Sequence, residues 1–182
     1  MRTAALMTVA TATGLLLSVC LRDVRAQAQQ PPETPGRPVA VPAPPPEYGP
    51  PVNNEQAKTA ADAAIAEAKK NNWHMAVSIV GPEGELIFFE KMDGAQSSSA
   101  ALAQAKARTS ALFRRPSKVF ADQFSAGNAA FMTFPDGARP IASEGGIPII
   151  LNGKLSGAIG VSGGTAPQDT VAATAGANAV KP

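Results

Sequence analysis

The sequence predicts an α+β fold in which helices pack on an antiparallel sheet. Two tight turns carry most of this prediction. Gly81-Pro82-Glu83-Gly84 and Asn152-Gly153 each separate two runs of strand-like composition. Asn-Gly tolerates the positive φ angles that a type I′ hairpin turn requires at both central positions. Helix-like segments flank these hairpins, and this order favours antiparallel strands over strand–helix–strand crossovers.

The first half of the domain reads helix, strand, strand, helix. After Asn54, a capping residue, alanines recur at i, i+3 and i+4 spacing, which is typical of an amphipathic helix. The Asn71-Asn72 pair ends that helix. Strands are expected at 73–80 and 85–92, followed by a helix that begins after Ser97 or Ser98 and stops before Pro116.

The second half begins with a short helix at 117–126 and a less regular segment that holds a short strand at 130–134. Strands at 147–151 and 154–161 form the Asn-Gly hairpin. Thr165 and Gln168 have the spacing of a capping box and predict a last helix at about 167–179. One face of the 154–161 strand carries the small residues Ser156, Ala158 and Gly160, so an alanine-lined helix could approach it closely.

The N-terminus has the pattern of a secretory signal peptide, residues 1–26. Arg2 precedes an uncharged, mostly apolar run, and small residues suit cleavage after Ala26 or Ala28. The alternatives are a membrane anchor and a lipidated Cys20. We favour cleavage, which predicts a periplasmic or secreted protein without stable membrane insertion.

Residues 27–52 form a proline-rich linker, with ten prolines between positions 27 and 51. We interpret it as an extended, disordered tether that precedes a single domain at 53–182. Cys20 is the sole cysteine and lies within the signal. The mature chain is therefore expected to lack disulfides and thiolate ligands.

The charge balance argues against nucleic-acid binding. The chain has 16 basic and 14 acidic residues, and the signal removes Arg2, Arg22, Arg25 and Asp23. The remaining 13 of each give no net charge, whereas a nucleic-acid-binding surface is usually basic.

Five short blocks carry a family resemblance. They are Lys91-Met92-Asp93-Gly94-Ala95, the run from Ala105 to Thr109, Arg115-Pro116-Ser117, the run from Glu144 to Pro148, and the run from Gly157 to Gly164 followed by Asp169. Together they resemble the GlcG/HbpS haem-binding family across about residues 55–180. The Gly81-Pro82-Glu83-Gly84 turn departs from the family pattern, in which an Asp usually ends the first strand.

The resemblance implies a profilin-like fold with a five-stranded antiparallel sheet flanked by helices. It also implies ring-like homo-oligomers and haem, or another small anionic ligand, as the binding partner. A haem axial ligand would most naturally be His74, the one histidine of the chain, because neutral imidazole commonly ligates haem iron. A surface position for this ring is the alternative, and Met75, Met92 and Met132 are weaker candidates.

The candidate ligand-binding residues are Asp93, Lys106, Glu144, Gly145 and Gly146. Lys106 lies in an apolar helix stripe, either reaching water or holding an anion such as a haem propionate, with Arg108 and Arg114 as alternates. Asp93 either caps a turn or faces a pocket. The Gly145-Gly146 amides suit an anion, and Glu144 suits a general base or a strand-entry turn.

The sequence thus predicts an exported haem-binding protein for haem capture, storage or sensing. A small-molecule enzyme that acts on an organic acid or aromatic substrate through Lys106, Asp93 and Glu144 is the first alternative. A structural oligomer without ligand is the second. The residue inventory does not favour an enzyme, since His74 has no nucleophile context around it.

Overall fold

The computed structural model describes residues 44–182. The predicted signal peptide and most of the predicted linker therefore lie outside the described residues. Within 44–182, no helix combines the length and the apolar character needed to cross a bilayer.

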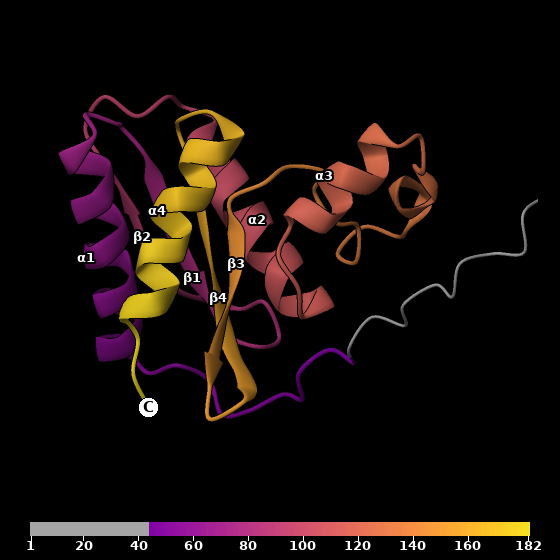
Figure 1. Cartoon of the computed structure of the whole chain (residues 1–182), viewed down its shortest axis with the longest axis horizontal. Coiled ribbons are helices and arrows are strands. Elements are labelled where there is room, and N and C mark those ends of the chain that lie inside the picture. The colour runs from indigo at the N-terminus through magenta and orange to yellow at the C-terminus, as the bar shows by residue number, and fades with distance from the viewer. Residues whose placement is uncertain (1–43) are drawn as a thin grey trace, which may run out of the picture. The chain divides into compact units, whose positions relative to one another are not determined.

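The described chain alternates helices and hairpins in the predicted order (Figure 1). The elements are α1 (Asn54–Lys70), β1 (Ala76–Val80), β2 (Leu86–Lys91), α2 (Ser99–Phe113), α3 (Lys118–Ser125), the 3₁₀ helix η1 (Ala130–Thr133), β3 (Gly146–Leu151), β4 (Lys154–Ser162) and α4 (Ala166–Ala179). Each predicted helix is present. The first is capped by Asn53 rather than Asn54, and the Thr165–Gln168 capping box is confirmed.

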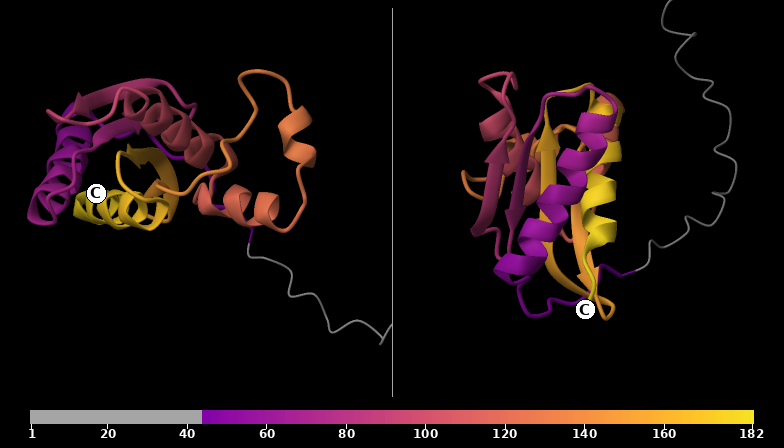
Figure 2. Two further views of the ribbon diagram at one scale, coloured as in Figure 1. Left: turned by 90° about the horizontal axis from the view of Figure 1, so that it is seen from above. Right: turned by 90° about the vertical axis from the view of Figure 1, so that its left-hand side faces the viewer.

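The strands form one antiparallel sheet in the order β2-β1-β4-β3. Helices α1 and α4 lie side by side on one face, and α2 covers the other (Figures 1 and 2). The main core lies under α1 and α4, where helix alanines pack on Val77, Ile79, Ile159 and Val161. A smaller cluster on the opposite face joins Ala107 and Ala111 of α2 to Val80 and Ala158.

The expectation of five strands is wrong for the described residues, whose sheet has four. The segment predicted as a short strand at 130–134 instead forms η1, outside the sheet. Residues 47–52 come nearest to a fifth strand, because the amides of Gly49 and Val52 donate to the Leu155 and Ser156 carbonyls at 2.8 Å each. The intervening Pro50-Pro51 has no N–H to donate, so the pairing is limited to an isolated bridge.

The ordered domain therefore begins before the expected boundary at Asn53. Val52 is buried, and Tyr48 lies under the Arg114 guanidinium, 5.0 Å from the ring centroid. Glu47 forms an ion pair with Lys154. This end of the predicted linker is part of the packed structure.

Two glycines let α2 approach the sheet. Gly146 and Gly160 face each other across β3 and β4. A Cβ at Gly160 would meet the Ala103 carbonyl oxygen, and one at Gly146 would meet the Lys106 carbonyl oxygen. The predicted close approach to the small-residue face is confirmed, and it fixes the height of α2 over the sheet.

The β3–β4 hairpin turns at Asn152 and Gly153, whose φ angles are +51° and +76°, as a type I′ turn requires. We expect Gly153→Val to lower the free energy of unfolding by roughly 1–3 kcal/mol, because a β-branched residue is strained at positive φ. A Cβ at this position has no neighbour within 4 Å, so strain is the only cost. Gly153→Asn is the control, since asparagine tolerates this conformation. Equal urea midpoints for Gly153→Val and wild type would contradict this reading.

Candidate functional site

Lys106 is buried on α2 and is paired inside the protein. Its side chain is 2% exposed, and Nζ donates to the Asp169 carboxylate of α4 at 2.6 Å and to the Val161 carbonyl at 3.1 Å. The second Asp169 oxygen accepts from the Gly164 amide at 2.9 Å. The pair links the two helix layers through the end of the sheet. Both hydrogen bonds of the amine that the structure shows are made within the protein, whereas the sequence predicted contact with water or with an anionic ligand.

Burial raises the pKa of the Asp169 carboxyl, because desolvation disfavours the charged form. The hydrogen bond and charge of Lys106 act against that rise. The ionised carboxylate thus depends on its lysine partner, which makes the pair a structural unit.

Gly145 and Gly146 provide close packing around this pair. A Cβ at Gly145 would lie 2.7 Å from both the Asp169 Cβ and the Val161 oxygen. The Gly146 amide donates to Ser117 Oγ at 2.9 Å, so it is already used. The structure thus shows both glycines in close packing contact with the Lys106–Asp169 region.

Glu144, which lies just before β3, forms hydrogen bonds with residues of α3 and α4. Its carboxylate accepts from Lys118 of α3 and from Thr170 of α4, both at 3.3 Å. Lys118 also donates to Asp122 at 2.6 Å, and these two carboxylates raise the pKa of the Lys118 amine. A carboxylate held by a cation and a hydroxyl is poorly suited to act as a general base.

His74 and Asp93 lie together at the sheet end where β1 begins and β2 ends. The exposed His74 ring contacts the Asp93 carbonyl through Nδ1 at 2.7 Å, and the Asp93 side chain is exposed. This geometry matches the turn and surface alternatives. Neither residue lines the cavity described next.

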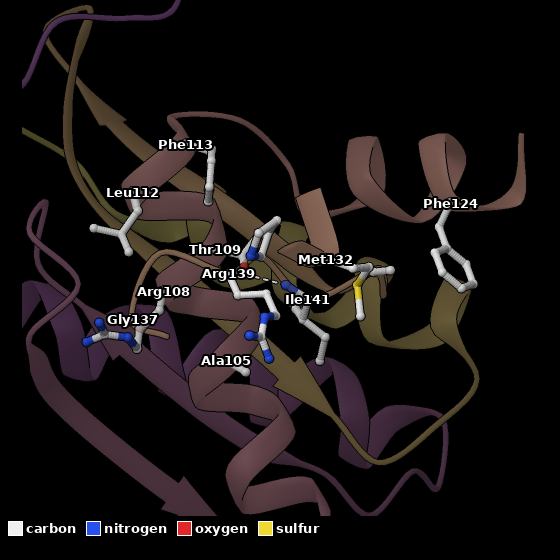
Figure 3. A pocket seen from close by; sticks show the side chains of 12 residues that line it. Ala105, Arg108, Thr109, Leu112, Phe113, Phe124, Met132, Gly137, Arg139 and Ile141 are labelled. Atoms are coloured by element: carbon white, nitrogen blue, oxygen red, sulfur yellow. Dashed lines mark hydrogen bonds between the residues drawn. The ribbon is translucent and has the colours of Figure 1, made fainter. Parts of the chain in front are cut away.

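Residues 118–142 project from the rest of the domain in Figure 1, and we call this segment the arm. A cavity of about 460 Å³ lies between the arm and α2 (Figure 3). Helix α2 contributes Ala105, Arg108, Thr109, Leu112 and Phe113, and the arm contributes Phe124, Met132, Arg139 and Ile141. Thr109 Oγ1 accepts the Ile141 amide at 3.0 Å and holds the far end of the arm against α2. The volume is in the range of small-molecule sites.

Two guanidinium groups border this mostly apolar space. Arg108 Nη1 donates to the Gly84 carbonyl at 2.9 Å, and no carboxylate of residues 44–182 lies within ion-pair distance of it. Arg139 pairs with the exposed Asp136 at 3.0 Å. Exposed guanidiniums beside an apolar wall suit a ligand with an apolar body and anionic ends.

The described residues offer no group of three His, Cys, Asp or Glu side chains that could hold a bare metal ion. Among residues 44–182, the one sulfur that borders the cavity belongs to Met132.

Comparison with known proteins places the chain in a family. Residues 52–178 match the family model described as haem degrading protein HbpS-like. The chain belongs to the HbpS-like family. GlcG of Escherichia coli is 36% identical over 111 residues, which is 61% of this chain and 81% of GlcG. The sequence-based resemblance is thus confirmed.

Solved structures of the HbpS-like fold agree. A double mutant of Streptomyces reticuli HbpS has a TM-score of 0.65 at 26% identity, covering 79% of this chain and 96% of that one. A PduOC:haem complex has a TM-score of 0.66 at 24% identity, covering 71% and 95%, and supports the fold alone.

In this HbpS-like chain, sequence reasoning missed most of the cavity. Arg108 and Met132 were named only as secondary candidates, and Phe124 and Arg139 were not singled out. The arm has no regular periodicity, so nothing local indicated that its side chains meet α2. The proximity of Asp169 to Lys106 was equally hidden, because 63 residues separate them.

Proposed function

We propose that this protein binds haem in the α2–arm cavity. The observation that carries the proposal is an apolar cavity with a guanidinium from each wall, in a chain of a family described as haem degrading. The ring of a porphyrin is apolar and its two propionates are anionic. The apolar side chains of the cavity therefore match the ring, and the two guanidiniums match the propionates.

The residues present fit the group. Leu112, Phe113 and Phe124 offer apolar and aromatic surface to the ring, while Arg108 and Arg139 are placed to receive the propionates. When bound, haem supplies redox and oxygen chemistry that these side chains lack. Binding is the step that capture, storage, sensing and degradation of haem share.

The enzyme alternative built on Lys106, Asp93 and Glu144 gains no support. Lys106 is committed to Asp169 and Glu144 to Lys118 and Thr170, while Asp93 is not among their contacts. These three groups therefore do not form an acid–base constellation.

The test is titration of the full chain with haem, followed by absorption spectroscopy. We expect a saturable Soret band. Arg108→Ala and Arg139→Ala should each weaken affinity by about tenfold or more, because a hydrogen bond to a charged group contributes about 1.5–3 kcal/mol and exposure reduces this. Ala105→Phe should fill the cavity and weaken binding further.

Lys58→Ala provides the matched control, since Lys58 is an exposed cation on α1, away from the cavity. It should bind haem as the wild type does. Absence of saturation, or equal affinity in all four variants, would refute binding in this cavity.

We also propose that the protein is a homo-oligomer. The arm exposes Phe124, Met132 and Phe134, which are 50%, 44% and 39% accessible. Apolar side chains gathered on one projection favour an interface between subunits. Light scattering at micromolar concentration should give a mass several times that of one chain. A strictly monomeric mass would contradict this proposal.

Export to the periplasm or beyond is proposed from the sequence of residues 1–26 alone. N-terminal sequencing of the protein purified from its host should find a mature chain that begins with Gln27 or Gln29. An intact Met1 or a lipidated Cys20 would count against this proposal.

A further inference from the structure

Four side chains of the described residues could ligate haem iron through a neutral nitrogen or thioether: His74, Met75, Met92 and Met132. They differ in burial and in their position relative to the cavity. Met75 is fully buried within the main core, and Met92 packs against the same core. His74 is turned to the Asp93 carbonyl and does not border the cavity.

Met132 differs from the other three in position and exposure. It lies on η1 in the arm, is 44% exposed, and borders the cavity together with Phe124 and Arg139. In Figure 3 its side chain lies between those of Phe124 and Ile141, and the Arg139 guanidinium lies beyond Ile141. The sulfur is thus available on the same wall that offers an aromatic contact and an anion contact.

We propose that the thioether of Met132 is the protein's ligand to the iron of bound haem; this inference rests on the proposed function. Thr109 supplies the one side-chain oxygen among the α2 residues that line the cavity, and this Oγ1 already accepts the Ile141 amide in a residue that is 3% exposed. A methionine thioether is a soft, neutral ligand known for haem iron, and it favours the ferrous state.

Comparison of haem with iron-free protoporphyrin tests this assignment in the full chain. The two ligands share the ring and the propionates and differ in the metal. Met132→Leu preserves the apolar volume and removes the sulfur. We expect it to weaken haem affinity by about tenfold, to shift the Soret band and to lower the reduction potential of the complex. Its affinity for protoporphyrin should remain that of wild type.

Two matched variants complete the experiment. Met92→Leu makes the same chemical change beside the core. It should leave the affinities for haem and protoporphyrin, and the absorption spectrum of the haem complex, unchanged. His74→Ala should also leave the spectrum unchanged. A Met132→Leu complex with the wild-type band and potential would overturn the assignment, as would a band shift in His74→Ala.

The failure of this inference and that of the proposed function are distinguishable. If Met132→Leu weakens haem and protoporphyrin equally, the side chain only packs on the ring, and the ligation proposal fails while the cavity proposal stands. If neither ligand saturates the wild-type chain, both proposals fail.

Discussion

Replacing Lys106 by methionine is expected to lower the free energy of unfolding by about 3–5 kcal/mol, because it leaves a buried carboxylate without its cation. Lys106 and Asp169 are 2% and 4% exposed, and their atoms approach to 2.6 Å. Methionine retains most of the aliphatic volume, so the loss reports the missing charge and hydrogen bonds. Urea-induced unfolding followed by circular dichroism measures it.

Two comparisons isolate the buried charge. Lys58→Met breaks an ion pair with Asp62 whose partners are 61% and 56% exposed, and it should cost less than about 1 kcal/mol. The double variant Lys106→Met/Asp169→Leu should be more stable than Lys106→Met alone, because no unpaired charge remains. A Lys106→Met protein as stable as Lys58→Met would contradict the buried pair.

The loss in Lys106→Met should also depend on pH. Burial already raises the pKa of Asp169, and removal of Lys106 takes away the group that opposes this rise. The folded state then binds a proton more tightly than the unfolded state does. The defect should be smallest below the unfolded-state pKa of about 3.9 and should grow as pH rises through the raised folded-state pKa.

Features set by residues close together in the sequence could be predicted, whereas features set by residues far apart in the sequence could not. Asn152-Gly153 and Thr165–Gln168 were recognisable because each signal acts over two to four residues and has one preferred conformation. The helix order followed from periodicity alone. The five-stranded sheet, in contrast, came from family resemblance, and η1 occupies the sequence position of the expected extra strand.

The candidate site was predictable only as a set of residue types. The sequence indicates that Lys106 is an unusual amine in an apolar stripe. Both predicted partners of the amine, water and an anionic ligand, lie outside the protein. The actual partner, Asp169, lies on α4 and reaches Lys106 only because β4 ends between the two helices. No local sequence pattern predicts the contact between Lys106 and Asp169. The same is true of the contact between the arm, which carries Met132 and Arg139, and α2.

The glycine pair under α2 contributes to the contact between Lys106 and Asp169. Gly146 and Gly160 let the α2 backbone rest on the sheet, and this depth places Lys106 within reach of Asp169. A side chain at either glycine would have to displace helix backbone, since the nearest atoms at Gly160 are the Ala103 oxygen and the Ala107 nitrogen.

We therefore expect Gly160→Ala to lower the free energy of unfolding by about 3 kcal/mol, the upper part of the range for overpacked cores, because backbone cannot rotate away as a side chain can. Its φ is not in the left-handed region, so the loss would report steric displacement without backbone strain. Gly81→Ala is the matched control. The three atoms nearest to its new methyl all belong to the exposed Glu85 carboxylate, which can move, and the cost should stay within about 0.5 kcal/mol. Equal urea midpoints for Gly160→Ala and Gly81→Ala would show that α2 does not rest on the sheet at this depth, and the burial of Lys106 would then lose its structural basis.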